Sequence, residues 1–413
     1  MRISFESSHI SREFSARELR IVVRRDDPER GISQVNAAYF EVPPDFHTHN
    51  DSVAAALLAL VNPSAARVQF NFPVSAFCAA ALRRAYALEE VGPVDPALEP
   101  RTPGQMLGLC LSGGLDSMAI WVALRRMLGD EFRVITLQLG GGFAFEERGF
   151  SLFRRDVTCR TDIVQAGLYT NPWVVFVVPL LFADYLDLGS ITTGHHFGET
   201  PLSVESLRDG SRPRFLAYDA GLLAGGVAQV HLARVLNSIG LLHLGLLAEP
   251  EMLAVCFRAS APPGKLKHYH KGLGLRILLQ RVGAPEPDWL ANLAPPTSPS
   301  NLAGFPGLRF TALYIIRYLG LSSIAPAYAD AERFDFSFLD TLSLAFMERY
   351  NTNLTQYIPA SLHAPYLRVL HAAGIEPYRE GDWDELEQLR AFNQALSDDR
   401  APRRVSQADA RQV

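Results

Sequence analysis

The feature that most constrains this chain is an apolar run that passes through a glycine turn into a helical pattern. Leu107 to Leu111 is short and apolar, which is typical of a buried parallel strand. Ser112-Gly113-Gly114 follows, and residues 115–128 then carry apolar side chains at helical spacing. A strand, a tight turn and a helix in this order predict the first unit of an alternating α/β fold.

Further strand and helix patterns follow this first unit. Residues 133–139 predict a second strand, and residues 190–194 predict the end of a later strand that enters a loop. Between them, residues 173–188 predict an apolar helix, with a strand plus a short helix as the alternative. This alternation predicts the α/β fold class, with a Rossmann-like, doubly wound parallel sheet.

Three regions of different character divide the chain. Residues 1–100 predict an N-terminal α+β unit that ends in a proline-rich linker, residues 101–285 hold the alternating pattern, and residues 286–413 are mostly helical in pattern. The expected strands of the first region are 21–23, 37–42 and 67–72, and its expected helices are 52–60 and 74–88. In the third region, helices are expected within 337–350 and 384–396.

Composition excludes several classes of protein. The 413 residues are 48% hydrophobic, and a net charge of −5 argues against a protein that coats nucleic acid. The longest apolar run, residues 173–183, is too short to span a membrane, and residues 1–20 lack the apolar core of a signal peptide. We therefore expect a cytoplasmic protein with no membrane partner.

The cysteines give no sign of a disulfide scaffold or a zinc ribbon, because no two of them form a CxxC pair. They are Cys78, Cys110, Cys159 and Cys256. Cys256 with His268 and His270 offers three zinc ligands at most, one fewer than a closed structural site needs. We expect no structural zinc.

The loop from Ser112 to Ser117 has the properties of a phosphate cradle. Its two glycines allow a tight turn that directs N–H groups toward an anion, and a helix beginning near Asp116 adds the positive end of its dipole. It is not a Walker loop, since no Gly-Lys-Ser/Thr follows. The alternative is a serine-capped turn without a ligand, but the strand–turn–helix context favours a di- or triphosphate.

The string Ser-Gly-Gly-Leu-Asp-Ser resembles the SGGxDS signature of the N-type ATP pyrophosphatases, the PP-loop enzymes of the HUP group. The resemblance implies a Rossmann-like domain of roughly 150 residues. It also implies an ATP-dependent, AMP-forming ligase or synthase. A substrate oxygen attacks the α-phosphate of ATP, pyrophosphate leaves, and a nucleophile then displaces AMP.

Roles for individual residues follow from this resemblance. Ser112, Gly113, Gly114, Leu115, Asp116 and Ser117 would bind the phosphates of ATP. Asp116 and Ser117 would be catalytic, with Asp116 beside Mg²⁺. Gln138 and Leu139, at the end of the second strand, would receive the adenine.

A second polar loop, residues 193–200, follows the later strand. By the same resemblance, Gly194 and His195 would lie beside the nucleotide, and Glu199 would bind Mg²⁺ through water. An ordinary polar loop with a helix cap at Thr200 is the alternative.

The segment after Cys256 is similar in outline to the 7-cyano-7-deazaguanine synthase (QueC-like) branch of the family. A Gly264-Lys265 turn, a basic stretch and a helix near 275–279 match, while the zinc-binding cysteines of that branch are absent. We expect residues 258–276 to act as a basic lid with hinges at Gly264 and Gly272. Lys265 and Arg276 would neutralise the leaving pyrophosphate.

The expected function is adenylation of a carboxylate or amide oxygen for transfer to a nitrogen nucleophile. The substrate would be a small carboxylate or a deazapurine, or a macromolecule modified as in bacterial antiviral defence, with a protein or nucleic-acid partner bound through residues 1–100. Two alternatives stay open: a tRNA or nucleoside thiolation enzyme that uses Cys159, and a non-catalytic nucleotide-binding scaffold subunit. A glutaminase of the asparagine synthetase type is not expected, since the chain starts Met1-Arg2-Ile3.

Overall fold

The computed structural model describes residues 1–10, 17–197, 216, 219–304 and 308–398. Contacts divide the chain into two compact units that interleave in sequence. Unit 1 comprises residues 1–112, 128–193 and 215–230, and unit 2 comprises residues 113–127, 194–214 and 231–413. The expected domain boundaries near residues 100 and 285 remain a prediction. Within the described ranges, no helix has both the length and the apolar character that a membrane span requires.

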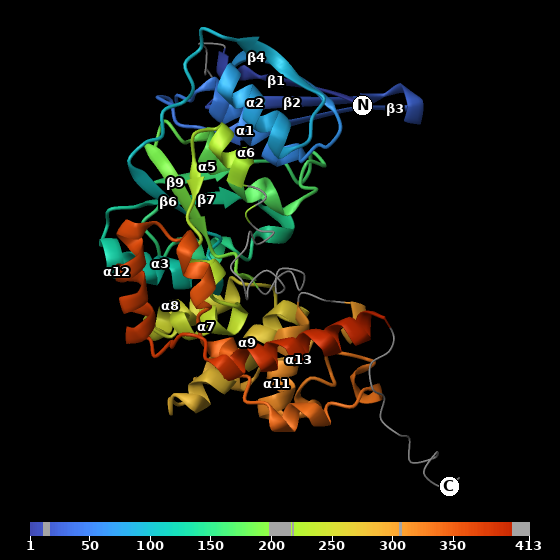
Figure 1. The fold of residues 1–413 in the computed structure, drawn as a ribbon, viewed down its shortest axis with the longest axis vertical. Coiled ribbons are helices and arrows are strands. Elements are labelled where there is room, and N and C mark those ends of the chain that lie inside the picture. Colours follow the sequence, from blue (N-terminus) through green and yellow to red (C-terminus); the bar gives the residue numbers. More distant parts are fainter. Residues whose placement is uncertain (11–16, 198–215, 217–218, 305–307, 399–413) are drawn as a thin grey trace. The chain divides into compact units, whose positions relative to one another are not determined.

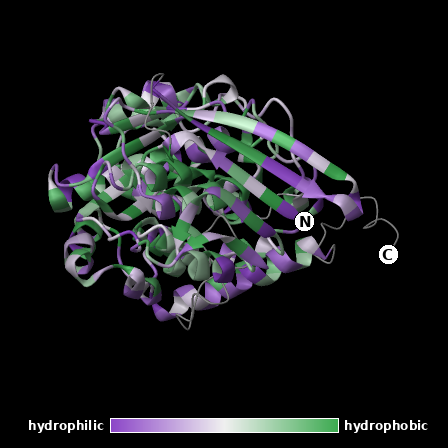
Figure 2. Ribbon diagram, turned by 90° about the horizontal axis from the view of Figure 1, so that it is seen from above, coloured by the Kyte–Doolittle hydropathy of each residue, from purple (hydrophilic) through white to green (hydrophobic). Residues whose placement is uncertain are grey.

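The first sheet of unit 1 has five strands in the order β3-β2-β1-β4-β5. They are β1 (Arg2–Ser7), β2 (Glu18–Asp27), β3 (Ile32–Glu41), β4 (Arg67–Ser75) and β5 (Glu90–Asp95). β2 pairs antiparallel with β1 and β3, whereas β4 pairs parallel with β1 and β5. Along β2, Leu19, Ile21 and Val23 are buried while alternate residues face outward. The same alternation of hydropathy runs along the long strands in Figure 2.

β5 corrects one expectation, because it occupies residues assigned from sequence to a proline-rich linker. β5 is the last strand of its sheet, and an edge strand tolerates Pro93, which has no N–H to contribute to a ladder. The glycine and proline therefore hid a strand whose Val91 is buried.

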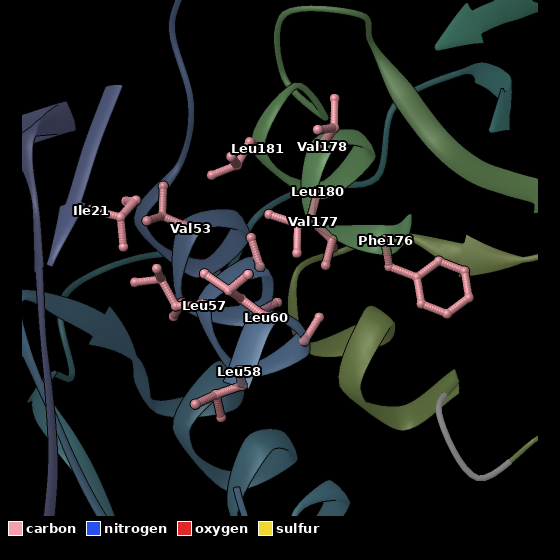
Figure 3. Packing of buried hydrophobic residues seen from close by; sticks show 14 of the residues in the cluster. Ile21, Val53, Leu57, Leu58, Leu60, Phe176, Val177, Val178, Leu180 and Leu181 are labelled. Atoms are coloured by element: carbon pink, nitrogen blue, oxygen red, sulfur yellow. The ribbon is translucent and has the colours of Figure 1, made fainter. Parts of the chain in front are cut away.

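Helix α1 (Asn50–Val61) packs inside unit 1 on nearly all of its faces, and residues 51–60 are all buried. A helix that is apolar all round is stable only when it is enclosed. Figure 3 shows Val53, Leu57 and Leu60 of α1 gathered with Val177 and Leu181 of α5 (Val177–Leu181) in one cluster. α2 (Ala76–Ala85) and α6 (Asp219–Ala224) also pack in this unit.

The second sheet of unit 1 is wholly parallel, in the order β10-β9-β6-β7-β8. Its strands are β6 (Met106–Cys110), β7 (Arg133–Gln138), β8 (Val157–Arg160), β9 (Leu188–Thr193) and β10 (Ala228–Gln229). Figure 1 labels β6, β7 and β9 of this sheet. From central β6 the chain adds β7 and β8 on one side and then β9 and β10 on the other. This is the 3-2-1-4-5 order that doubly wound folds share. The α/β class and the parallel sheet are thus confirmed.

Strand order also locates the place where such a sheet binds ligands. In doubly wound sheets, ligands bind beyond the carboxyl ends of the strands where the order reverses. The reversal here falls at β6, which lies between β7 and β9. The chain leaves β6 at Cys110 and enters the loop that the sequence singled out.

Unit 2 is helical, and no strand lies in its described part. Its helices are α3 (Leu115–Leu128, whose last residue belongs to unit 1), α7 (Ser238–Gly245), α8 (Pro250–Arg258), α9 (Leu266–Arg281), α10 (Asp288–Ala291), α11 (Arg309–Leu319), α12 (Ala360–Ala372) and α13 (Glu380–Ser397). The short α4 (Glu147–Phe150) belongs to unit 1.

Two helix expectations are wrong in extent. Residues 173–188 form a 3-10 turn (Pro172–Phe176) and the short α5, because Pro179 and the β-branched valines disfavour a long helix. Residues 337–350 form two separate 3-10 turns, Ser337–Thr341 and Ala345–Glu348, in place of one α-helix.

Candidate functional site

The turn between β6 and α3 depends on its glycines. Gly113 has a φ of +76°, a conformation that favours glycine, and a Cβ on Gly114 would lie 3.2 Å from Ser260 Cα. The N–H of Leu115 donates to Ser260 Oγ at 2.8 Å, and the Ser117 hydroxyl donates to the Gly114 carbonyl at 3.1 Å. Ser260 therefore fixes the position at which α3 begins.

Two backbone N–H groups of this turn are available to a ligand. Within the described residues, no acceptor takes the N–H groups of Gly113 and Gly114. They precede the first turn of α3, where a helix carries its partial positive charge. Backbone N–H groups at such a position are suited to bind an anion.

Asp116 lies in the first turn of α3 and pairs with a lysine of α9. Lys271 Nζ is 2.7 Å from Asp116 Oδ2, and the two side chains are only 10% and 16% exposed. Burial alone would raise the pKa of Asp116, but Lys271, Lys267 and His196 outweigh it and lower that pKa to about 2. The carboxylate is therefore ionised at neutral pH. Its Oδ1 is buried and has no hydrogen-bond partner among the described residues.

Asp116 lines a cavity of about 260 Å³ that lies within unit 2. The other lining residues are His196, Ser238, Leu242, Lys267, His270, Lys271, Leu308 and Thr311. Lys267 and Lys271 are one helical turn apart on α9, so both reach the same cavity. We call it the lysine cavity below.

His270 is the most deeply buried of the polar side chains that line this cavity. It is 2% exposed, and neither of its ring nitrogens has a hydrogen-bond partner in the described part of the chain. Burial lowers the pKa of His270 to about 3, so the ring is neutral and keeps one donor and one acceptor. Its nearest aromatic contact is Tyr328, with ring centroids 5.5 Å apart.

The polar loop after β9 reaches this site through a glycine and a histidine. A Cβ on Gly194 would lie 2.6 Å from the backbone N of Ser117, so only glycine lets the two segments approach this closely. His195 is half-buried, whereas its neighbour His196 lines the lysine cavity. Glu199, the expected Mg²⁺ ligand, lies outside the described residues.

Unit 1 has a separate apolar cavity of about 90 Å³ at the carboxyl ends of β6 and β7. Leu139, one of the two residues expected at the adenine, lines it together with Ile135 and Leu137. Gln138 is not among the lining residues, and its carbonyl accepts the N–H of Thr161 at 3.1 Å. Ser112 also lines this cavity.

From Leu266 onward the basic segment is helix α9, and only residues 259–265 before it are turns and irregular structure. Gly272 lies inside α9, where a Cβ would lie 2.5 Å from Leu293 Cδ2, so Gly272 is no loop hinge. Lys265 is exposed at the N-cap of α9, and Arg276 forms an ion pair with Glu286 at 2.7 Å. Neither lines the lysine cavity. The structure brings Lys267 and Lys271 to that cavity in place of the two cations chosen from sequence.

A sequence signal for these lysines exists. The chain has three lysines, all between residues 265 and 271, while its other basic side chains are arginines and histidines. Lysine presents a compact, strongly hydrated charge, and a cluster of it in an arginine-rich chain marks a special site. The missed residues also include His270, which the sequence offered only as a zinc ligand.

The cysteines are poor nucleophiles in this structure. Cys159, on which a thiolation enzyme would depend, is fully buried, and burial raises its pKa far above the ordinary value. Burial also raises the pKa of Cys110 and of Cys256 to about 12. His268 donates to the Ala261 carbonyl at 2.9 Å. No set of three potential metal ligands occurs among the described residues, and the absence of zinc stays a prediction.

Comparison with known proteins gives no relative: no family model, no curated protein and no solved structure matches this chain. Its function must therefore be argued from the loop and the cavities.

Proposed function

We propose that this protein is an N-type ATP pyrophosphatase of the QueC-like branch, which adenylates a carboxylate or amide oxygen and passes the product to a nitrogen nucleophile. The observation that carries the proposal is Asp116, an ionised carboxylate in the first turn of α3, directly after a glycine turn with open N–H donors. Asp116 Oδ1 is buried without a hydrogen-bond partner in the described part of the chain, which costs free energy that a bound ligand or ion would recover.

The phosphates of ATP are assigned to the N–H groups of Gly113 and Gly114 and to Lys271. Preorganised donors and cations of this kind stabilise the charge that gathers on a leaving pyrophosphate. Ser117 Oγ, which donates to the Gly114 carbonyl, supports the turn. For the adenine, the resemblance alone supports an assignment to Gln138 and Leu139.

Mg²⁺ fits the donor set. Asp116 Oδ1, which is buried and has no hydrogen-bond partner within the described ranges, is the kind of hard oxygen that Mg²⁺ prefers. Mg²⁺ is commonly held by one or two carboxylates together with substrate phosphates. Asp116 would hold the ion, with Glu199 as a second ligand in the proposal. Bound there, Mg²⁺ would supply charge neutralisation for pyrophosphate departure.

The reaction proposed has two balanced steps. A carboxylate oxygen bonds to the α-phosphorus, the bond to the bridging oxygen breaks, and its electron pair leaves with pyrophosphate. A nitrogen nucleophile then bonds to the acyl carbon and loses a proton as AMP leaves. The substrate class implied by the resemblance is a small carboxylate or deazapurine, with modification of a macromolecule in antiviral defence as the wider form of the same chemistry.

The test is the identity of the phosphate products. With MgATP and a panel of carboxylates, the protein should release AMP and pyrophosphate in equal amounts. Asp116→Asn should lower the rate by about 10² or more if the carboxylate acts in the transition state. The exposed Asp340→Asn is the matched control and should keep the wild-type rate. ADP and orthophosphate as products would contradict the proposal.

A non-catalytic nucleotide-binding subunit is the second candidate. It is favoured by the protein groups that already bind at this site: Ser260 Oγ accepts a hydrogen bond from the N–H of Leu115, and Lys271 Nζ donates to Asp116 Oδ2. Such a subunit would bind ATP without releasing pyrophosphate under any substrate panel. The thiolation alternative is disfavoured by the burial of Cys159, and a Cys159→Ser variant with unchanged turnover would remove it.

A further inference from the structure

Apart from the Asp116–Lys271 pair, the lining of the lysine cavity has its own composition. After Asp116 and Lys271 pair, Lys267 is the cation of the lining that has no ionic partner among the described residues. The rest of the lining consists of His196, His270, Ser238, Thr311, Leu242 and Leu308. It therefore combines one uncompensated positive charge, a neutral polar group and an apolar wall.

The charge count favours a monoanion. One ammonium matches one carboxylate, whereas a polyphosphate would bring several charges against it. Lys267 is exposed, so its ammonium is hydrated and can exchange water for a carboxylate without leaving a buried charge behind. An ion pair at such a position gives modest affinity and clear discrimination against a neutral analogue.

His270 requires a polar group on the ligand. Neither ring nitrogen has a hydrogen-bond partner among the residues that the structure describes, although His270 is 2% exposed, and a buried donor without an acceptor is costly. A ligand hydroxyl, which both donates and accepts, satisfies a neutral imidazole in either tautomer. Ser238 and Thr311 hydroxyls are bonded to each other at 2.7 Å and are thus already satisfied.

Size and polarity set the body of the ligand. Leu242 and Leu308 supply apolar surface, and the cavity volume is about 260 Å³. A cavity of about 150 Å³ lined by apolar side chains holds a benzene ring. A single six-membered ring with two small substituents therefore fits.

We propose that the lysine cavity binds a compact organic acid with one carboxylate, directed at Lys267, and a hydroxyl or similar donor–acceptor group, directed at His270. Binding stands on the cavity alone. Only the further claim, that an oxygen of this carboxylate becomes adenylated, rests on the proposed function.

The test uses three ring compounds that differ by one feature each: 3-hydroxybenzoate, benzoate without the hydroxyl, and 3-hydroxybenzamide without the charge. We expect 3-hydroxybenzoate to bind most tightly, benzoate about 5- to 10-fold more weakly for one lost hydrogen bond, and the amide about 2- to 5-fold more weakly for one lost exposed ion pair. In His270→Phe the advantage of 3-hydroxybenzoate over benzoate should vanish. In Lys267→Gln the advantage over the amide should vanish.

The small number of lysines gives an internal control. In protein labelled with ¹³C-lysine, the side-chain signals come from Lys265, Lys267 and Lys271. Titration with 3-hydroxybenzoate should shift the signal of Lys267 and leave that of exposed Lys265 in place. Equal binding of acid and amide, tighter binding of pyrophosphate than of the acids at Lys267, or no binding of the three probes would each overturn the inference. These readouts need no ATP, so they are independent of pyrophosphate release.

Discussion

At the residue scale, His270 makes the protein's stability depend on pH in a predictable direction. Burial lowers the pKa of His270 to about 3, while the unfolded chain takes up a proton near its ordinary value of about 6.5. Between these values the unfolded state binds more protons, so stability is present above about pH 6.5 and falls as pH drops toward about 3. His268 and His243 act in the same sense, because burial lowers their pKa values too.

His270→Gln isolates this contribution. The other titratable side chains that line the cavity are Asp116, His196, Lys267 and Lys271, and the variant leaves them unchanged. Between about pH 7 and about pH 5, the unfolding free energy of the variant should fall less than that of the wild type by about 2 kcal/mol. Urea unfolding across this range measures the difference. The exposed His47→Gln should follow the wild type, and a parallel wild-type and His270→Gln profile would contradict the buried neutral state.

The residues that sequence alone could identify are those held by chain-local rules. The Ser112–Ser117 loop was predicted because glycines, serines and a helix start follow one another in sequence. The partner of Asp116 was not, since Lys271 is 155 positions away and only the packing of α9 decides which lysine reaches α3. Spacing could show that Lys267 and Lys271 share a face, but not what that face meets.

At the element scale, the start of α3 depends on a close approach by the loop after β9. A Cβ on Gly194 would lie 2.6 Å from Ser117 N and 3.0 Å from its Cα. These are backbone atoms, which cannot rotate away as a flexible side chain would. Gly194→Ala should therefore displace the first turn of α3, cost about 1–3 kcal/mol of stability and weaken nucleotide binding.

Gly142→Ala is the control for that variant, because a Cβ there meets nothing within 4 Å. It should keep wild-type stability to within about 0.5 kcal/mol. Thermal unfolding and nucleotide titration of both proteins make the comparison. Wild-type behaviour of Gly194→Ala would show that the loop is not pressed against α3.

The elements of the fold were predicted to different depths. β4, which shows clear alternation, and the apolar runs of β6 and β7 lie where the sequence placed them, whereas only residues 21–23 of β2 were expected. β1, β5, β8 and β10 went unrecognised: β5 carries a glycine and a proline, β8 is four residues long and β10 is only two. Short strands depend on their neighbours for stability more than on their own residues, so local patterns under-report them.

At the scale of the whole molecule, the sequence predicted the type of sheet but not the order of its strands. Alternation predicted a doubly wound sheet, and the order β10-β9-β6-β7-β8 is of that type. The interleaving of the two units was not accessible, because residues 113–127 leave the unit that holds β6 and join distant helices. That exchange depends on long-range contacts between elements far apart in sequence.

The interleaving of the two units also predicts a pattern of amide hydrogen exchange along the chain. A ligand that binds the folded state raises the free energy of every local opening that breaks its site. The increase is about 2.7 kcal/mol when the ligand concentration is 100 times the dissociation constant. MgATP should therefore slow exchange at residues 113–118 and 265–271, which the sequence separates and unit 2 brings together through the Asp116–Lys271 pair. Residues 18–41, in β2 and β3 of unit 1, should exchange at unchanged rates. Asp116→Asn should abolish the protection at both segments together, since it removes the charge that joins them. Protection confined to one segment, or spread evenly over β2 and β3, would show that the nucleotide binds elsewhere.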